Sequence, residues 1–94
     1  NVYSFKDRRE DIVRANPVPF SLQSAVFTKN IDSALDTAKR LNASAVMIND
    51  HTAFRVDWMP FAGRKASGLG VGGIVSTMLE MTEEKMIVFR SKVI

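Results

Sequence analysis

Three glycines near the C-terminal end of this sequence have a spacing that could bind a nucleotide. Gly68, Gly70 and Gly73 form the pattern Gly-x-Gly-x-x-Gly, in which backbone N–H groups can hold the pyrophosphate of a dinucleotide. The pattern identifies such a site only when a buried strand leads into the glycines and an acidic residue ends the next strand. A polar loop leads into these glycines, and no acidic residue ends a later strand at the right distance. A dinucleotide loop is therefore not favoured.

Two pairs of neighbouring polar residues could support other chemistry. Asp50 and His51 are two members of a Ser-His-Asp triad, but no Gly-x-Ser-x-Gly elbow presents a serine, so a solvated or loop-packing His51 is favoured. Arg64 and Lys65 could bind a phosphate, although a helix-capping or surface role is the default for adjacent basic residues. With no Cys and one His, the chain offers no disulfide, no common zinc site and no thiol nucleophile.

The composition is typical of a small globular domain that binds neither nucleic acid nor a membrane. The 94 residues are 46% hydrophobic and 24% charged, which suits one domain with a modest core. The 13 basic and 10 acidic side chains are spread over both halves, so the net charge of +3 forms no basic stripe. No apolar run approaches the roughly 20 residues of a membrane helix. Since neither an initiator Met nor a signal peptide is visible, we expect a cytoplasmic chain cut from something longer.

Alternating strand and helix signals must position these polar residues. Residues 2–5 and 24–28 are rich in strand formers, and residues 44–49 form an apolar run expected to be buried on both faces. Asp7 begins a helix that Pro17 and Pro19 end. Asn30 begins the clearest helix, residues 31–41, whose apolar residues share one face: Ile31, Leu35, Ala38 and Leu41. This order predicts an α/β fold with parallel, doubly wound strands.

The second half of the chain is less regular. Residues 50–73 contain Pro60 and five glycines, and a loop of that length in a small domain is usually functional. A short helix is expected from residue 74 and a final strand over residues 85–90. Methionines at near-helical spacing there favour a core or a subunit interface: Met78, Met81 and Met86.

The stretch "MPFAGRKASGLG" resembles the Pro-Phe-Gly-Gly-x-Lys-x-Ser-Gly signature of the aldehyde dehydrogenase superfamily. The matching residues are Pro60, Phe61, Gly63, Lys65, Ser67 and Gly68. The segments "PFSLQSAVFTKNIDSALDTAKRLNASAVMIN" and "MTEEKMIVF" are similar to the family's neighbouring segments, so the resemblance covers essentially the whole chain. Ala62 replaces the first Gly of the Gly-Gly pair, and Gly72 stands where many members have Glu.

The resemblance implies a fold, a reaction and partners. Residues 1–82 would be part of a doubly wound, mainly parallel catalytic domain, with residues 50–73 as the substrate-entrance loop and residues 83–94 as a terminal oligomerisation strand. Family chemistry is thiolate attack on an aldehyde, hydride transfer to NAD or NADP, and thioester hydrolysis assisted by a Glu. The Cys, the Glu and nearly all of the nucleotide site would lie before Asn1. The chain would thus hold no catalytic residue and be inactive alone, and the parent enzyme would be a homo-oligomer, a dimer or tetramer.

The resemblance also implies roles for residues of the entrance loop. Thr52, Phe54 and Phe61 match positions that line the aldehyde entrance. Asn49 could orient the loop that bears the nucleophile, or its amide could bond to turn backbone at the strand end. The remaining signature residues would support the site. The alternative to an enzyme segment is a stand-alone fragment that serves only for assembly or interaction.

Arg55 raises the question of the substrate. A buried guanidinium needs a partner, which would be either Asp57 or an anionic substrate. The run "FRVDWMPF" is similar to family members that act on small aldehydes bearing a phosphonate, phosphate or carboxylate, such as the phosphonoacetaldehyde dehydrogenases. "SGLGVGGI" with "MTEEK" is similar to the non-phosphorylating glyceraldehyde-3-phosphate branch. This resemblance predicts that Arg55 binds the anionic head of a short aldehyde.

Overall fold

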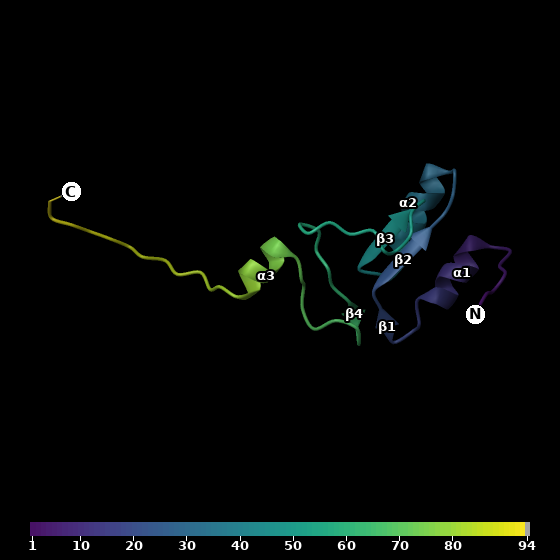
Figure 1. Ribbon diagram of the computed structural model, residues 1–94, viewed down its shortest axis with the longest axis horizontal. Coiled ribbons are helices and arrows are strands. Elements are labelled where there is room, and N and C mark those ends of the chain that lie inside the picture. Colours follow the sequence, from purple (N-terminus) through teal and green to yellow (C-terminus); the bar gives the residue numbers. More distant parts are fainter. Residues whose placement is uncertain (94) are drawn as a thin grey trace.

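A computed structural model describes residues 1–93 and has a parallel pair of strands in its N-terminal half (Figure 1). Strand β2 (Gln23–Val26) pairs in parallel with β3 (Ala45–Ile48), and helix α2 (Ile31–Arg40) connects them. Helix α1 (Arg8–Ala15) precedes this unit. A second, antiparallel pair joins β1 (Phe20–Ser21) to β4 (Arg64–Lys65), and α3 (Ile74–Glu80) follows it. The predicted helix–strand–helix–strand order of residues 7–49 is confirmed.

Both N-terminal helices begin where the sequence predicts, because a polar side chain satisfies a free backbone N–H at each start. The Asp7 carboxylate accepts a hydrogen bond from the N–H of Arg9 at 3.0 Å. The Asn30 side chain accepts one from the N–H of Ser33 at 2.8 Å. Lys39 and Arg40 lie in the last turn of α2, where positive charge stabilises the helix dipole.

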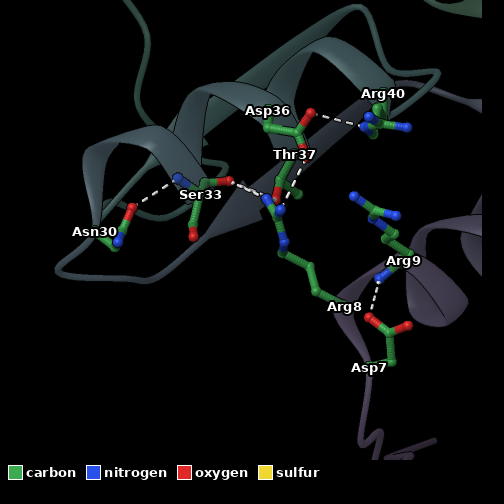
Figure 2. A network of polar contacts seen from close by, with 8 residues as sticks. All are labelled: Asp7, Arg8, Arg9, Asn30, Ser33, Asp36, Thr37 and Arg40. Carbon is green, nitrogen blue, oxygen red and sulfur yellow. Dashed lines mark hydrogen bonds and ion pairs between the residues drawn. The ribbon is translucent and has the colours of Figure 1, made fainter.

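Arg8 ties α1 to α2, as Figure 2 shows. Its guanidinium donates to the Ser33 carbonyl at 2.7 Å and to the Thr37 hydroxyl at 2.9 Å, and it pairs with Asp36 at 2.9 Å. Asp36 also accepts from Arg40, one turn later in α2, at 2.8 Å. No local pattern distinguishes Arg8 from its neighbour Arg9 for this contact.

Replacing Asp36 with Asn should make the protein slightly less stable at neutral pH but not in acid. The hydrogen bond from Arg40, together with the charges of Arg40 and Arg8, holds the pKa of the Asp36 carboxyl below its usual range. The stabilisation is thus present above the ordinary pKa of about 3.9 and is lost as the pH falls through the lower folded-state value. Urea unfolding midpoints measured from pH 7 to pH 2 should converge for the two proteins. A constant difference over that range would contradict the prediction.

The core within this chain is very small. Only Ile12, Ala34 and Thr37 are buried among residues 1–93. The radius of gyration is 19.9 Å, whereas a self-contained domain of this length has about 12 Å. The prediction of a globular unit with its own core is therefore wrong, because the chain lacks a second layer to cover its apolar faces.

That missing layer explains two further differences from the predicted burial. Ile31 and Leu35, expected on the inner face of α2, are 63% and 56% exposed. Strand β3 is half-buried along its length instead of buried on both faces. A doubly wound sheet is likewise not formed by residues 1–93, which contribute two separate pairs of strands.

Some predicted strands have no hydrogen-bonding partner within the chain. Residues 2–5 form no strand, and the pair of β1 with β4 was not predicted because two-residue strands carry no periodic pattern. Residues 83–93 are neither helix nor strand and extend away from the rest (Figure 1). The intermolecular strand expected there stays a prediction, and Ile94 lies outside the described residues. None of the helices within residues 1–93 is long and apolar enough to cross a membrane.

Candidate substrate-entrance site

The loop of residues 50–73, named the entrance loop after the role that the resemblance predicts, leaves the sheet at Asn49, beside the carboxyl ends of β2 and β3. The Asn49 side chain accepts from the Thr28 N–H at 2.8 Å and donates to the Thr28 carbonyl at 2.9 Å. Its backbone has φ of 57°, a left-handed conformation that Asn tolerates well. The amide thus joins the end of β3 to Thr28, just after β2, as the strand-end interpretation predicted. The other interpretation, in which Asn49 orients the loop that bears the nucleophile, stays a prediction.

Replacing Asn49 with Gly or with Ala should separate the contribution of its side-chain hydrogen bonds from that of its left-handed backbone. Both variants lose two side-chain hydrogen bonds, together about 1 to 3 kcal/mol of folding free energy. Only Ala adds strain in the left-handed conformation, roughly 1 kcal/mol more. Denaturant unfolding should rank wild type above Asn49→Gly and Asn49→Gly above Asn49→Ala. Equal stability of the two variants would argue against the left-handed backbone.

The first turn of the entrance loop contains Thr52 and Phe54 and is closed by a hydrogen bond from the Phe54 N–H to the His51 carbonyl. The imidazole Nδ1 of His51 accepts from the Ala53 N–H at 3.1 Å, and the side chain is 74% exposed. Asp50 lies 3.9 Å from the other ring nitrogen. These contacts match the solvated histidine expected from the sequence, and they bring no serine to His51.

Arg55 and Phe61 are brought together by the next part of the loop. The Arg55 guanidinium carbon lies over the Phe61 ring, 4.7 Å from its centroid, a cation–π contact. Two hydrogen bonds of 2.9 and 2.7 Å between the backbones of Phe61 and Gly72 hold the backbone at Phe61 in place. Within residues 1–93 Arg55 forms no ion pair with Asp57, and it is exposed. The premise of a buried guanidinium is therefore wrong for this chain, because nothing in it covers this side of the loop.

The signature turn, residues 63–68, requires glycine at both ends. A Cβ on Gly63 would lie 2.1 Å from the Ser67 carbonyl oxygen, and one on Gly68 would lie 2.3 Å from that of Gly63. The turn is closed by hydrogen bonds from Ser67 to Arg64 and from Gly68 to Lys65. Backbone therefore packs directly on backbone here, which only glycine permits. Pro60 directly precedes Phe61, and Ala62 follows Phe61 without a positive φ.

The adjacent basic residues, Arg64 and Lys65, both bond to groups of the chain itself. The Lys65 ammonium donates to the carbonyl of Asn16, the residue that ends α1, and to the Val18 carbonyl at 2.8 Å. Arg64 donates to the Asn42 side chain at 3.3 Å. The helix-capping interpretation is confirmed for Lys65.

The glycine-rich stretch holds a carboxylate of its own chain. Glu80, at the end of α3, accepts from the Val71 N–H at 3.0 Å, and a Cβ on Gly70 would lie 3.2 and 3.3 Å from its two oxygens. Gly73 begins α3 with φ of 116°. The Val71 N–H, which a pyrophosphate in this stretch would need, is thus occupied by the Glu80 carboxylate. Nor do residues 1–93 contain a group of three side chains that could hold a metal ion.

Sequence reasoning missed several contacts because they join distant segments. No sequence pattern indicated that Glu80 contacts the glycine-rich stretch, since a Glu at the end of a helix is commonly solvated. Asn16 could have been found, because an Asn before Pro17 marks the end of a helix.

Comparison with known proteins identifies a family over most of the chain. The family model for the aldehyde dehydrogenase family matches residues 1–87. A lactaldehyde dehydrogenase of Methanococcus maripaludis is 41% identical over 90 residues, which are 96% of this chain and 19% of that protein. A 3-sulfolactaldehyde dehydrogenase of Priestia aryabhattai is 38% identical over 79 residues, 84% of this chain and 17% of the relative. The chain thus spans about a fifth of the length of these relatives.

Solved structures agree with this result. An aldehyde dehydrogenase from Physcomitrella patens, in complex with the reaction product succinate, has a TM-score of 0.82 and 34% identity, over 92% of this chain and 18% of that one. An NADP-dependent glyceraldehyde-3-phosphate dehydrogenase from Bacillus halodurans, complexed with NADP, has a TM-score of 0.81 and 42% identity, over 86% of this chain and 17% of that one. An aldehyde dehydrogenase from Bacillus cereus was solved as an NAD+ complex. It has a TM-score of 0.70 and 36% identity, over 73% of this chain and 14% of that one.

Proposed function

Because the chain belongs to the aldehyde dehydrogenase family, we propose that it is the C-terminal segment of an NAD(P)-dependent enzyme that oxidises a small aldehyde to its acid. The observation that carries this proposal is the match over residues 1–87, which includes the signature turn with its two sterically required glycines. The chain has no Cys, and its glycine-rich stretch holds Glu80 instead of a phosphate. The nucleophile, the Glu base and the cofactor site would then belong to the part of the enzyme that this sequence does not include.

In this proposal the chain shapes the entrance through which the aldehyde reaches the nucleophile. Thr52, Phe54 and Phe61 would confine the carbon chain of the substrate. Asn49 and the signature turn would hold the two ends of the entrance loop. The segment performs no chemical step itself, so it would be inactive alone.

We further propose that the aldehyde carries an anionic group, which Arg55 binds. The guanidinium is exposed, lies on the Phe61 ring and has no carboxylate partner among residues 1–93, so its donors are available to a ligand. The names of two relatives support an anion, since sulfolactaldehyde carries a sulfonate and glyceraldehyde 3-phosphate carries a phosphate. A phosphonate, as in phosphonoacetaldehyde, has the same chemistry. Lactaldehyde is neutral, so the family relationship alone does not decide the charge.

The assembly and location of the enzyme are also proposals. Apolar residues of the C-terminal segment are highly exposed in this chain, as a subunit interface would require. A cytoplasmic homo-oligomer, dimer or tetramer, is the assembly we propose.

The decisive experiment is an assay of the purified native protein with NAD+ and NADP+ and a panel of short aldehydes, half of them anionic. We expect oxidation of at least one anionic aldehyde and an intact polypeptide mass about five times the 10.5 kDa of this chain. A native mass of 10.5 kDa without activity would contradict the proposal and favour the interaction fragment. Oxidation of neutral aldehydes only would contradict the anionic substrate but not the enzyme.

A further inference from the structure

The ends of α1 and α2 meet at Asn16, which bonds to two other segments of the chain. Its side chain donates to the Arg40 carbonyl at the end of α2 and accepts from the Asn42 N–H, both at 2.9 Å. Its backbone carbonyl accepts from the ammonium of Lys65 in the signature turn. One half-buried residue therefore connects both helix ends to the entrance loop.

The signature turn is fastened to the same region by further hydrogen bonds. The Ala66 N–H donates to the Pro19 carbonyl at 3.1 Å, and the Ser67 hydroxyl accepts from the Ser21 N–H at 3.2 Å. Lys65 itself pairs with Phe20 across the short antiparallel sheet. The turn thus lies against residues 16–21 along its whole length.

Lys65 also has an unusual backbone. Its φ of 53° is left-handed, a conformation that a long side chain rarely adopts unless its surroundings hold it there. The ammonium holds it by reaching two carbonyls at the end of α1. The side-chain contact and the backbone conformation therefore depend on each other.

We propose that Lys65 and Asn16 are positioning residues. They determine the position of Phe61 at the substrate entrance and, with it, the position of Arg55, which lies on the Phe61 ring. Phe61 lies two residues before Gly63, where the turn packs backbone on backbone and cannot flex independently. A displacement of the turn would consequently be transmitted to the backbone at Phe61. The inference rests on the proposed function and adds residues to it that do not touch the aldehyde.

The geometry distinguishes positioning from a general contribution to stability. Lys65 and Val18 are exposed, and Asn16 is only half-buried. Without the ammonium, water can bond to the freed carbonyls, so the loss of folding stability should be small. What water cannot replace is the fixed distance between the turn and the end of α1.

The test uses the full-length enzyme with Lys65→Met, Lys65→Arg and Arg64→Met as a matched control. Methionine keeps an unbranched stem but removes the donors. We expect Lys65→Met to raise the KM for the aldehyde about tenfold or more, because small displacements of substrate-positioning groups have effects of that order. The KM for NAD(P)+ should stay unchanged. Lys65→Arg should recover most of the loss, and Arg64→Met should behave as wild type.

Asn16→Ala is the second variant, needed in case Lys65→Met does not fold. It removes the side-chain bonds to Arg40 and Asn42 but keeps the backbone carbonyl that accepts from Lys65. It should raise the aldehyde KM in the same way, and the double variant should lose less than the product of the two single effects, since the two sets of contacts hold the turn in series through Asn16. Hydrogen exchange at the amides of Ser67 and Gly68, which close the turn, should speed up in each variant. An unchanged aldehyde KM with unchanged exchange in folded Lys65→Met would overturn the inference, as would an equal loss in Arg64→Met.

The outcome is separable from that of the proposed function. If the wild-type protein oxidises no aldehyde, the proposed function fails, while the exchange measurement still reports whether Lys65 and Asn16 hold the turn. Faster exchange without an effect on KM would overturn the link to the entrance.

Discussion

Replacing Arg55 with Ala in the full-length enzyme should lower kcat/KM at least about tenfold for an anionic aldehyde while leaving a neutral aldehyde of equal length nearly unaffected. A hydrogen-bonded contact to a charged group contributes roughly 1.5 to 3 kcal/mol, which corresponds to a tenfold loss or more. The measurement is steady-state kinetics on a matched pair of aldehydes that differ only in the anionic group.

The expected selectivity follows from the surroundings of the guanidinium. Its face is occupied by the Phe61 ring at 4.7 Å, whereas its N–H donors have no carboxylate partner among residues 1–93. A planar guanidinium stacked on an aromatic ring presents its donors at the ring's edge, in a geometry suited to a two-pronged contact with phosphate or carboxylate.

Two further variants separate the contributions of charge and geometry. Arg55→Lys keeps the positive charge but loses the planar stack, so it should recover only part of the anionic selectivity. Asp57→Asn should leave selectivity unchanged, since Asp57 does not pair with Arg55 here. Equal losses on both aldehydes in Arg55→Ala would make Arg55 a structural residue and leave the substrate's charge open.

Local features of the fold could be predicted from the sequence because their causes are local. Asp7 and Asn30 begin their helices through hydrogen bonds within three residues, and a sequence window contains both partners. The parallel pair of β2 and β3 follows from two strand-forming runs separated by a helix of crossover length.

Long-range features could not be predicted, because their partners lie far apart or outside this chain. The spacing of Ile31 and Leu35 predicts one apolar, buried face of the helix, yet no layer within residues 1–93 covers them. The contacts of Lys65 span 47 and 49 residues, and nothing in a periodic pattern pairs them. The contact of Glu80 with Val71 depends on where α3 lies, which no local pattern indicates. The spacing of the glycines alone suggested a bound phosphate, whereas the chain's own carboxylate binds there.

Deleting residues 85–94 should abolish the native oligomer and yield monomers or insoluble protein. Met86, Ile87, Val88 and Phe89 are 76 to 86% exposed in this chain and are arranged without helix or strand. An extended apolar segment with unpaired backbone groups is a strong candidate to add a strand to another sheet.

The burial expected on such pairing is large enough to control assembly. Full burial of one large apolar side chain contributes about 1.5 to 3 kcal/mol, and alternate residues such as Ile87 and Phe89 would face the same side of a strand. Size-exclusion chromatography with light scattering compares the truncated enzyme with wild type and with Lys92→Ser, which changes the same segment without removing apolar surface. Substituting Ile87 and Phe89 together by Ser should act like the deletion, because the strand would keep its backbone bonds but lose its buried face. A truncated enzyme that remains soluble at the wild-type oligomer size would show that this segment does not hold the subunits together.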